Sequence, residues 1–537
     1  MSRQAKSRKR AFHSPTNAPR LRLLRDSLRP NFWTLLVAAI SATVAPVAFT
    51  KHLPMQDLPV LASMARALAQ GGESQWCSRL EMSLGLRPYA AFFVPASALA
   101  RVVDAIDAVR LLTAMYVVAL PLAVAIWLQA LGKRRPWTAI LVVPLTYSDI
   151  YTLGLLNYLW SMVLAFLAAA AAIRIAKDDA RMRAAIAFSV IAILMLLLHP
   201  FGVALTALLI IPGLPAFIRR PRRLLWIAGA ALPLAFLVLY FKDTLQPALG
   251  PSHSLPMQIK LHYLLMTPWI LLEGGTPALA IAAMICAAFV VFVLIVDLRH
   301  RGILTLVRQS SSLSCLAAVL VAVGLYAVLP FVSGDTVWID LRIAPVVWIL
   351  LIALIDTEGR NQRSALIASS VLVAITVAGV SLVHSRFDRE IAPLDTTIEA
   401  IEPDSRVLAI ALDLTSDAYT PFYSRSGAIQ YFSLYVGFGN YYHALKGGFS
   451  PFMTFGYAWS PLRLNPLPQS LTFGSADVFQ PAALLRRLPE LSNEFDYLLL
   501  RTRDRLGFPW VGSQASLVSE AGEFSAWRLD HGHRQLR

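Results

Sequence analysis

Long apolar segments recur along most of the chain and are separated by short polar connections. Most have about 17 to 25 residues, which as a helix is enough to cross a hydrocarbon core of ~30 Å. None shows the period-two alternation of membrane strands, so the pattern predicts a bundle of α-helices rather than a barrel. We predict eleven spans, at 32–50, 109–131, 137–152, 155–175, 184–199, 203–218, 224–241, 275–297, 312–332, 341–356 and 364–384.

The composition supports this class. Hydrophobic residues make up 57% of the chain and charged residues only 15%, with a mean hydropathy of +0.58. Soluble domains carry on average ~45–50% apolar and ~25% charged residues. The chain is therefore predicted to be a polytopic membrane protein, with membrane lipid as its surroundings.

The positive charge is concentrated before the first span. Residues 1–30 carry nine bases and one acid, which is half of the formal net charge of +16. This position favours a topology signal under the positive-inside rule over contact with anionic lipid, and it gives no reason to expect a nucleic-acid partner. We predict that residues 1–31 form a disordered cytoplasmic tail before an uncleaved anchor, since a full-length span follows them.

Clusters of Lys and Arg then set the register of the spans. They fall at 132–135, 174–183, 219–223, 299–308 and 357–363, after every second crossing. This register holds only if the apolar segment 88–103 does not cross, so we predict a helix there that lies along the outer surface. The membrane domain is thus 32–384, with a long outer loop at 51–108 and the carboxyl terminus outside.

Residues 385–537 differ sharply from the rest, with 16 acids and 14 bases. We predict an extracytoplasmic α+β domain, with strands at 406–412, 497–501 and 526–529 and a helix at 481–488. An aromatic and glycine-rich stretch runs from 419 to 459. It has two interpretations: a platform for a carbohydrate or a lipid headgroup, or loops that pack their own aromatic rings.

Every predicted outer loop of the membrane domain carries an ionisable residue near the end of a span. Such residues are costly close to a bilayer and tend to serve a cavity, a partner or a reaction. These candidates are Asp57, Asp149, His199, Glu273, Asp340 and Arg342.

Each candidate also has a structural alternative. Asp57 is a general base or metal ligand, or else the cap of a helix over 58–69 with Pro59 in its first turn. Asp149 is a second ligand or a solvated loop residue. His199 serves proton transfer or phosphate contact, or simply occupies a turn before Pro200.

The last three candidates have similar alternatives. Asp340 and Arg342 are too close in sequence to form a helical i,i+4 pair, which leaves Arg342 available for a phosphate or as an interfacial arginine. Glu273 stands before two glycines and fits an interfacial turn.

These features resemble the GT-C class of glycosyltransferases, which use polyprenyl-phosphate sugars. The resemblance is carried by the first span and its long outer loop with Asp57, by Asp149 in the next loop, by the outer carboxyl-terminal domain, and by the Arg342 region. The segments 155–160 (LLNYLW), 199–202 (HPFG) and 340–342 (DLR) also resemble uncharacterised bacterial membrane proteins of this architecture.

The resemblance implies transfer of a sugar from a polyprenyl-phosphate donor to an envelope glycan, lipid or protein, outside the bacterial inner membrane. Asp57 would activate the acceptor and Asp149 would be the second acid of the site. Arg342, with Lys51 or Arg87, would hold the phosphate, and His199, Glu273 and Asp340 would contact substrate. The second loop lacks the paired acids DxD or ExD, so a divalent metal is left open and no cofactor is assigned.

Such a reaction needs a carboxylate to accept the proton of a hydroxyl and a cation to stabilise the departing phosphate. Two other classes stay open. A transporter of a lipid or polysaccharide precursor would show internal repeats, and none is found. A non-catalytic scaffold for envelope assembly would need no acid at the outer surface. Neither HExxH nor GxSxG is present.

Overall fold

The computed structural model describes the chain from Phe32 to Asp530 with gaps. The described ranges are 32–71, 80–82, 86–132, 137–177, 181–240, 252–301, 310–333, 336–355, 362–420, 433–450, 452, 460–464, 484, 486–487, 491, 493–503 and 515–530. The predicted cytoplasmic tail lies outside these residues.

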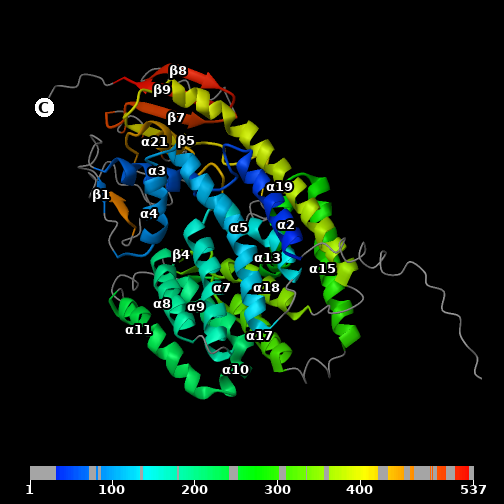
Figure 1. Ribbon diagram of the computed structural model, residues 1–537. Coiled ribbons are helices and arrows are strands. Elements are labelled where there is room, and N and C mark those ends of the chain that lie inside the picture. Colours follow the sequence, from blue (N-terminus) through cyan, green and yellow to red (C-terminus); the bar gives the residue numbers. More distant parts are fainter. Residues whose placement is uncertain are drawn as a thin grey trace, which may run out of the picture.

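A bundle of apolar helices forms most of the molecule, with a smaller layer of strands at one end (Figure 1). The helices of the bundle, in chain order, are α2 (Phe32–Ala48), α5 (Ala105–Leu131), η2 (Trp137–Tyr147), α6 (Asp149–Leu153), α7 (Leu156–Lys177), α8 (Arg181–Leu198), α9 (Phe201–Ile210), η3 (Ile211–Gly213), α10 (Leu214–Ile218), η4 (Pro221–Arg223), α11 (Leu224–Tyr240), α13 (Met257–Met266), η6 (Thr267–Trp269), α14 (Ile270–Glu273), α15 (Pro277–Arg301), α17 (Ser310–Val328), η7 (Leu341–Ile343), α18 (Ala344–Leu354) and α19 (Gln362–Glu399).

Seven helical segments among the described residues are long and apolar enough to cross a membrane. Their outward side chains are largely apolar, as expected of surfaces that face lipid. Shorter apolar helices occupy four more of the predicted spans, at Val37–Ala48, Thr138–Leu153, Ser312–Val328 and Leu341–Leu354. The protein is thus a multi-pass membrane protein, and the number of eleven crossings stays a prediction.

The first outer loop folds into two short helices that pack on the end of the bundle. These are α3 (Leu58–Gln70) and α4 (Ala90–Leu99). The predicted surface helix at 88–103 corresponds to α4, which at 10 residues is much shorter than a span. Phe92 and Phe93 on α4 are buried, so this helix belongs to the protein core at the end of the bundle.

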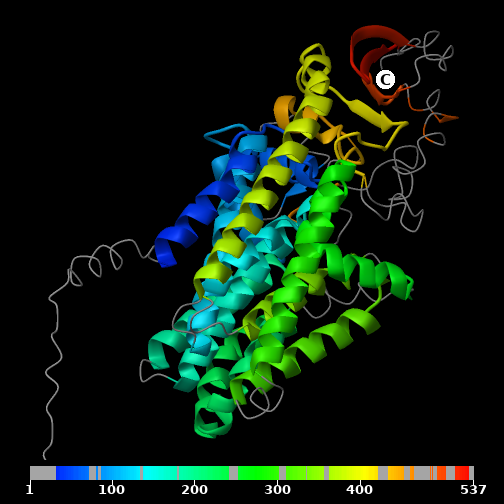
Figure 2. The same cartoon turned by 90° about the vertical axis from the view of Figure 1, so that its right-hand side faces the viewer.

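The membrane and outer domains share one long helix. α19 runs without a break across the predicted boundary at 384 and 385 and passes from the bundle to the sheet (Figure 2). Its outer half packs on β8 (Ala515–Ala521) and β9 (Phe524–Leu529). The domain boundary therefore lies inside a helix rather than at a linker.

The outer domain contains a four-stranded sheet of order β5-β7-β9-β8. β5 (Val407–Ala411) and β7 (Tyr497–Arg501) are parallel, and β9 is antiparallel to both β7 and β8. The sequence predicted β5, β7 and most of β9 but missed β8. The predicted helix at 481–488 lies mostly outside the described residues.

Three smaller elements complete the domain and the loops. They are α21 (Asn440–Lys446), the pair of β1 (Leu80–Met82) with β6 (Leu462–Leu464), and the short sheet of β2 (Ser252–His253), β3 (Val332–Ser333) and β4 (Thr336–Val337). Within the aromatic stretch, Tyr435, Tyr441 and Tyr442 are fully buried. These rings pack inside the protein, so the part of the stretch that the structure describes fits the packing interpretation.

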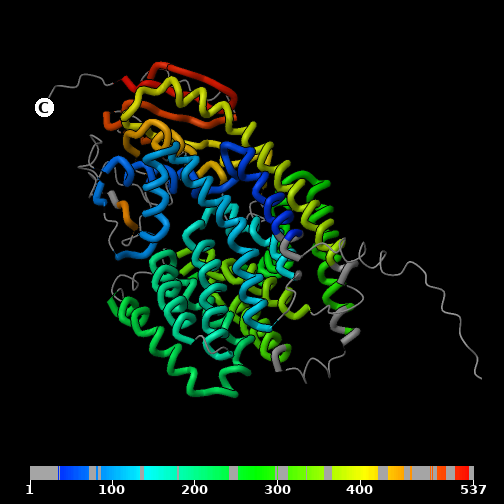
Figure 3. The backbone as a smooth tube through the Cα atoms, in the orientation of Figure 1, coloured from blue at the N-terminus to red at the C-terminus, as the bar shows by residue number. Residues whose placement is uncertain are grey.

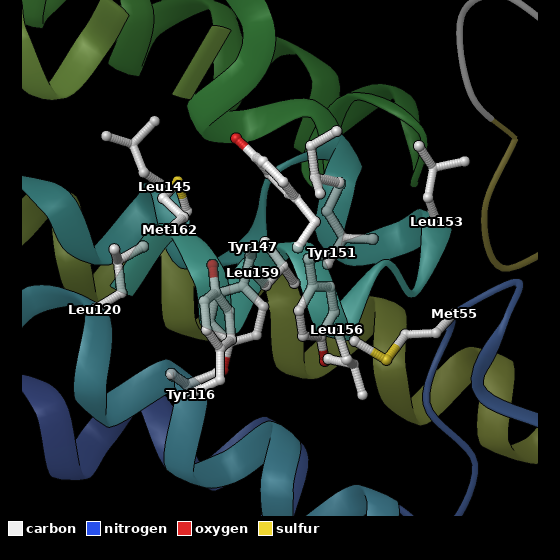
Figure 4. Packing of buried hydrophobic residues seen from close by; sticks show 14 of the residues in the cluster. Met55, Tyr116, Leu120, Leu145, Tyr147, Tyr151, Leu153, Leu156, Leu159 and Met162 are labelled. Atoms are coloured by element: carbon white, nitrogen blue, oxygen red, sulfur yellow. The ribbon is translucent and has the colours of Figure 1, made fainter. Parts of the chain in front are cut away.

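The outer domain packs directly on the first outer loop. α21 lies beside α3, which places orange and blue segments side by side in Figure 3. One hydrophobic cluster continues from the bundle into the outer domain, from Leu53 to Tyr435 and Phe524. Deeper in the bundle the same cluster includes Tyr116, Tyr147 and Tyr151 (Figure 4). This shared core fixes the loops at the outer end of the bundle.

Candidate active site

Asp57 stands immediately before α3. It occupies the capping position with φ −90° and ψ −5°, yet its carboxylate makes no capping hydrogen bond to the helix. Pro59 in the first turn has no N–H to be capped. The capping alternative for this side chain is therefore wrong, and the carboxylate is left for another role.

The backbone of the second outer loop is hydrogen-bonded to the backbone of Gln56 and Asp57. The backbone N–H of Asp57 donates to the carbonyl of Leu153 at 3.2 Å, and that of Gln56 donates to the carbonyl of Thr152 at 2.9 Å. Gly154 ends α6 at φ +76°, and a Cβ there would lie 2.9 Å from the Asp57 nitrogen. Only glycine tolerates both the backbone conformation and this contact.

Arg342 is a buried cation whose contacts include no carboxylate. Its Nη1 lies 3.2 Å from Nε2 of His199 and its Nη2 donates to the carbonyl of Val337 at 3.3 Å. The guanidinium also lies near the rings of Tyr158 and Phe201, at 5.6 and 6.0 Å. Its side chain forms no salt bridge within the part of the chain that the structure describes. A buried charge in this state favours binding of an anion.

The charge of Arg342 reaches Asp57. Burial raises the pKa of Asp57 to about 7, and the neighbouring Gln56 amide and the charge of Arg342 limit this rise. A carboxyl group with a pKa near 7 is a stronger base than an ordinary aspartate and is still largely ionised just above neutral pH. Asp57 and Arg342 are thus a carboxyl group of raised pKa and a cation that interact electrostatically.

His199 contacts Arg342 through its imidazole ring. The Phe201 N–H lies 3.2 Å from Nδ1 and Nη1 of Arg342 lies 3.2 Å from Nε2; a neutral imidazole has one acceptor nitrogen, so it accepts from only one of these two donors. Tyr89, at φ +70°, packs against the same ring at 5.6 Å. The segments that carry His199 and Arg342, far apart in the sequence, are therefore in contact.

The two other predicted phosphate cations are placed differently. Arg87 is half-buried and lies two residues before Tyr89, whose ring packs against His199. Lys51 instead forms an ion pair with Asp395 of α19 at 2.7 Å. Lys51 is thus paired with an acid of α19, and Arg87 stays a predicted phosphate cation.

Asp340 is neutralised by a residue that the sequence analysis did not select. Its Oδ2 lies 3.0 Å from Nζ of Lys260, and both side chains are buried. The other oxygen accepts a hydrogen bond from the Leu341 N–H at 2.8 Å. Lys260 is the one cation within α13, and a lone lysine in an otherwise apolar helix was the available signal.

Two further predicted site acids, Asp149 and Glu273, have buried carboxylate oxygens. Asp149 at the start of α6 is fully buried, and neither carboxylate oxygen has a hydrogen-bond partner among the described residues. The charges of Asp340 and Glu273 act on it. Glu273 accepts from His262 at 2.7 Å through one oxygen, while the other is buried. The solvated-loop alternative for Asp149 is therefore wrong.

The candidate site thus has two sides. One side, toward the first outer loop, contains Asp57, Arg342 and His199. The other side contains Asp149, Glu273 and Asp340. Within the described residues no three His, Cys, Asp or Glu side chains are placed to hold a metal ion together. Sequence reasoning also missed Gln56 and Tyr89, which gave no signal beyond their nearness to selected residues.

Two solved structures of ArnT are similar to this chain over nearly its whole length. ArnT from Cupriavidus metallidurans in the apo state superposes with a TM-score of 0.52, at 9% identity over 95% of this chain and 98% of that one. Its structure bound to undecaprenyl phosphate gives 0.50, at 11% identity over 92% and 97%. This chain has a GT-C-like fold.

Two other findings complete the comparison. Arabinofuranosyltransferase AftD from Mycobacteria aligns at 13% identity over 93% of this chain and 42% of that chain, with a TM-score of 0.44. No protein-family profile matches the sequence, and no curated protein sequence matches it. Because the ArnT likeness covers nearly all of both chains, the GT-C-like fold includes the outer domain as well as the helices.

Proposed function

We propose that this protein is a membrane glycosyltransferase. It transfers a sugar from a polyprenyl-phosphate donor to a hydroxyl group of an envelope glycan, lipid or protein, at the outer face of a bacterial inner membrane. The supporting observation is the buried guanidinium of Arg342, which has no carboxylate partner among the described residues and acts electrostatically on Asp57. ArnT, whose fold is similar, has been solved with undecaprenyl phosphate bound.

In the proposed reaction Asp57 is the general base. Its carboxylate takes the proton of the acceptor hydroxyl while that oxygen forms a bond to the anomeric carbon of the donor. The bond from that carbon to the phosphate oxygen breaks, and the polyprenyl phosphate leaves with the electron pair. A single displacement of this kind inverts the anomeric configuration and needs no carboxylate nucleophile.

The departing phosphate is held by cations that have no acidic partner among the described residues. Arg342 presents a planar guanidinium that suits a phosphate, and the neutral His199 beside it does not compete as an anion. Arg87 adds a second charge from the start of α4. We leave Lys51 out of this group because Asp395 already neutralises it.

The second side of the site is proposed to bind hydroxyl groups. Asp149 and Glu273 have buried carboxylate oxygens without partners in the part of the chain that the structure describes, and sugar hydroxyls are suitable donors to them. Asp340 holds the start of η7 through its bonds to Lys260 and the Leu341 N–H, and so supports Arg342 two residues later.

The test is turnover of a panel of polyprenyl-phosphate sugars by purified protein, with Asp57→Asn and Asp107→Asn compared in one detergent. Asp107 is a half-exposed aspartate on α5 and provides the matched control. Loss of a general base reduces kcat by roughly 10²- to 10⁴-fold. We expect this loss in Asp57→Asn, with donor binding retained, and none in Asp107→Asn.

The outcome separates the candidate functions. Equal turnover in wild type and Asp57→Asn would remove Asp57 as the base. Absence of donor binding by the wild type would overturn glycosyl transfer and favour a scaffold or a transporter. Donor movement across vesicles without product would indicate the transporter.

A further inference from the structure

A mostly apolar groove runs between α8 and α11, on the far side of the bundle from the four-stranded sheet (Figure 1). Its volume is about 380 Å³. Ser189 joins the two helices at one end of the groove, because its hydroxyl donates to the Ala230 carbonyl at 2.7 Å. A Cβ on Gly229, in the α11 wall, would meet no atom within 4 Å. The groove therefore has open space for an apolar chain.

The groove opens on a surface that faces lipid. α8 and the segment Pro221–Tyr240 are each long and apolar enough to cross a membrane. Leu225 and Trp226 in the α11 wall are exposed, and so are Leu232 and Phe236 further along the same helix. Acyl chains surround a surface of this kind, so we expect an acyl chain to occupy the groove.

Positive charge gathers beside the groove. The connections 174–183 and 219–223 carry eight bases and two acids. They meet in space, because Arg220 donates to the Lys177 carbonyl at 3.1 Å and Arg223 donates to the Ala176 carbonyl at 2.7 Å. These bonds hold the start of α11 against the end of α7, four residues before α8 begins. Two basic segments that are more than 40 positions apart thus form one cluster.

Helical geometry places this cluster at the end of the groove opposite to Ser189. Arg181 lies one turn before Ala185, and Arg222 in η4 lies one turn before Leu225, both of which line the groove. Side chains one turn apart share a face of a helix, so the two arginines continue the faces that form the groove walls. α8 and α11 both begin at this end, and the N–H groups of their first turns add positive potential.

We propose that the groove binds an anionic phospholipid, with an acyl chain between α8 and α11 and the phosphate at Arg181 and Arg222. Guanidinium groups suit a phosphate, and basic pockets between membrane helices are suited to lipid headgroups. The positive-inside rule accounts for arginines in these connections but requires no groove beside them. The site lies at the end of the bundle away from Asp57, so the proposal does not depend on glycosyl transfer.

The first experiment measures lipid binding by the full-length protein in detergent. Native mass spectrometry follows the phospholipid that stays bound when phosphatidylglycerol or phosphatidylcholine with the same acyl chains is added. Arg222→Gln is compared with Arg299→Gln, which changes an exposed arginine of another basic connection, at the end of α15.

We expect wild type to prefer phosphatidylglycerol. Arg222→Gln should bind it roughly fivefold more weakly, and Arg299→Gln should bind it as wild type does. Equal binding of the two lipids by wild type would overturn the proposal. Equal losses in the two variants would also overturn it, because general surface charge would then be responsible.

The second experiment tests the groove itself. Gly229→Leu places a side chain in the open space, and Gly324→Leu on α17 is the matched control, since a Cβ there also meets nothing within 4 Å. Leucine favours a helix more than glycine does, so both variants should fold, which the melting temperature checks. We expect Gly229→Leu to lose bound phosphatidylglycerol and Gly324→Leu to keep it. Equal retention, or equal loss, in the two variants would remove the groove from lipid binding and sink the proposal.

Discussion

Two buried arginines in different regions of the molecule have opposite surroundings: among the described residues, one contacts carboxylates and the other does not. Arg501, in β7 of the outer domain, lies 2.5 Å from Glu523 and 3.6 Å from Glu390 and stacks over Tyr435 at 3.5 Å. Arg342, at the outer end of the bundle, meets an imidazole, one carbonyl and two aromatic rings. Both side chains are buried: Arg501 is 0% exposed and Arg342 is 7% exposed.

The difference shows how a structural cation is distinguished from a candidate binding cation. A buried charge is stabilised by its own carboxylates when it serves the fold, and removing it leaves those carboxylates uncompensated. A buried charge without a carboxylate is costly to the fold and is compensated when an anion binds. Lys260 belongs to the first kind, because Asp340 pairs with it at 3.0 Å. The comparison therefore singles out Arg342.

The largest effect is expected from Arg342→Gln. Loss of a preorganised donor to a developing anion lowers turnover by roughly 10²- to 10³-fold. Stability should change little, because no partner carboxylate is left unpaired. Measurement of kcat/KM together with the melting temperature tests this, and a variant that unfolds while its folded fraction keeps full turnover would reverse the assignment.

Arg501→Gln should show the opposite behaviour. Glu390 and Glu523 would lose their cation, and breaking a buried ion pair in this way costs about 3–5 kcal/mol. We expect a lower unfolding midpoint in denaturant with unchanged turnover per folded molecule. A strong loss of turnover without loss of stability would place Arg501 in the reaction and remove the contrast with Arg342.

Gly154→Ala tests how tightly the second loop holds Asp57. The new Cβ would lie 2.9 Å from the Asp57 nitrogen, in a backbone conformation with φ +76°. Displacement of a catalytic group by a fraction of an ångström lowers turnover by roughly ten- to a hundredfold. Gly71→Ala is the control, since it has φ +62° with nothing within 4 Å of the new Cβ. Equal losses in both variants would show that backbone strain, not contact with Asp57, is responsible.

The smallest effect is expected from a change of His52, which links the first outer loop to α19 through Asp388 and Asp395. Burial by itself would lower the pKa of His52, but hydrogen bonds to Asp388 and Asp395 outweigh it, so that the pKa is raised above 6.5. His52 therefore stabilises the fold fully below pH 6.5 and loses this contribution as the pH rises through its raised pKa. His52→Gln should lower stability by up to about 1 kcal/mol at pH 5.5 and by less at pH 8.5. A difference that does not depend on pH would contradict the ion pairs.

Helices and strands were predicted best where one property, such as hydropathy, repeats along a segment. Apolar length and the positions of Lys and Arg predicted the helical membrane domain and the change to an α+β domain. Period-two patterns predicted β5, β7 and β9. The edge strand β8 was missed because its central residues are mostly exposed and polar, which removes the hydrophobic signal.

The site was predicted as a set of residues but not as an arrangement. Asp57, Arg342 and His199 were selected because ionisable residues near a bilayer are costly. Their grouping, and the separation of Lys51 from them, depend on contacts between residues more than 100 positions apart. The role of Lys260 could not be read from the chain, because an amine has no structural role until its partner is known.

The sequence by itself determined that this is a helical membrane protein with a carboxyl-terminal α+β domain, because hydropathy and charge act along the chain and need no knowledge of its fold. Only the tertiary structure decided which charges are neutralised. Lys260 meets Asp340 and Arg501 meets Glu523, while Arg342 meets no carboxylate among the described residues. Pairing is a property of distance in space, and the interaction energy of two charges depends on that distance and on their burial rather than on their order in the chain.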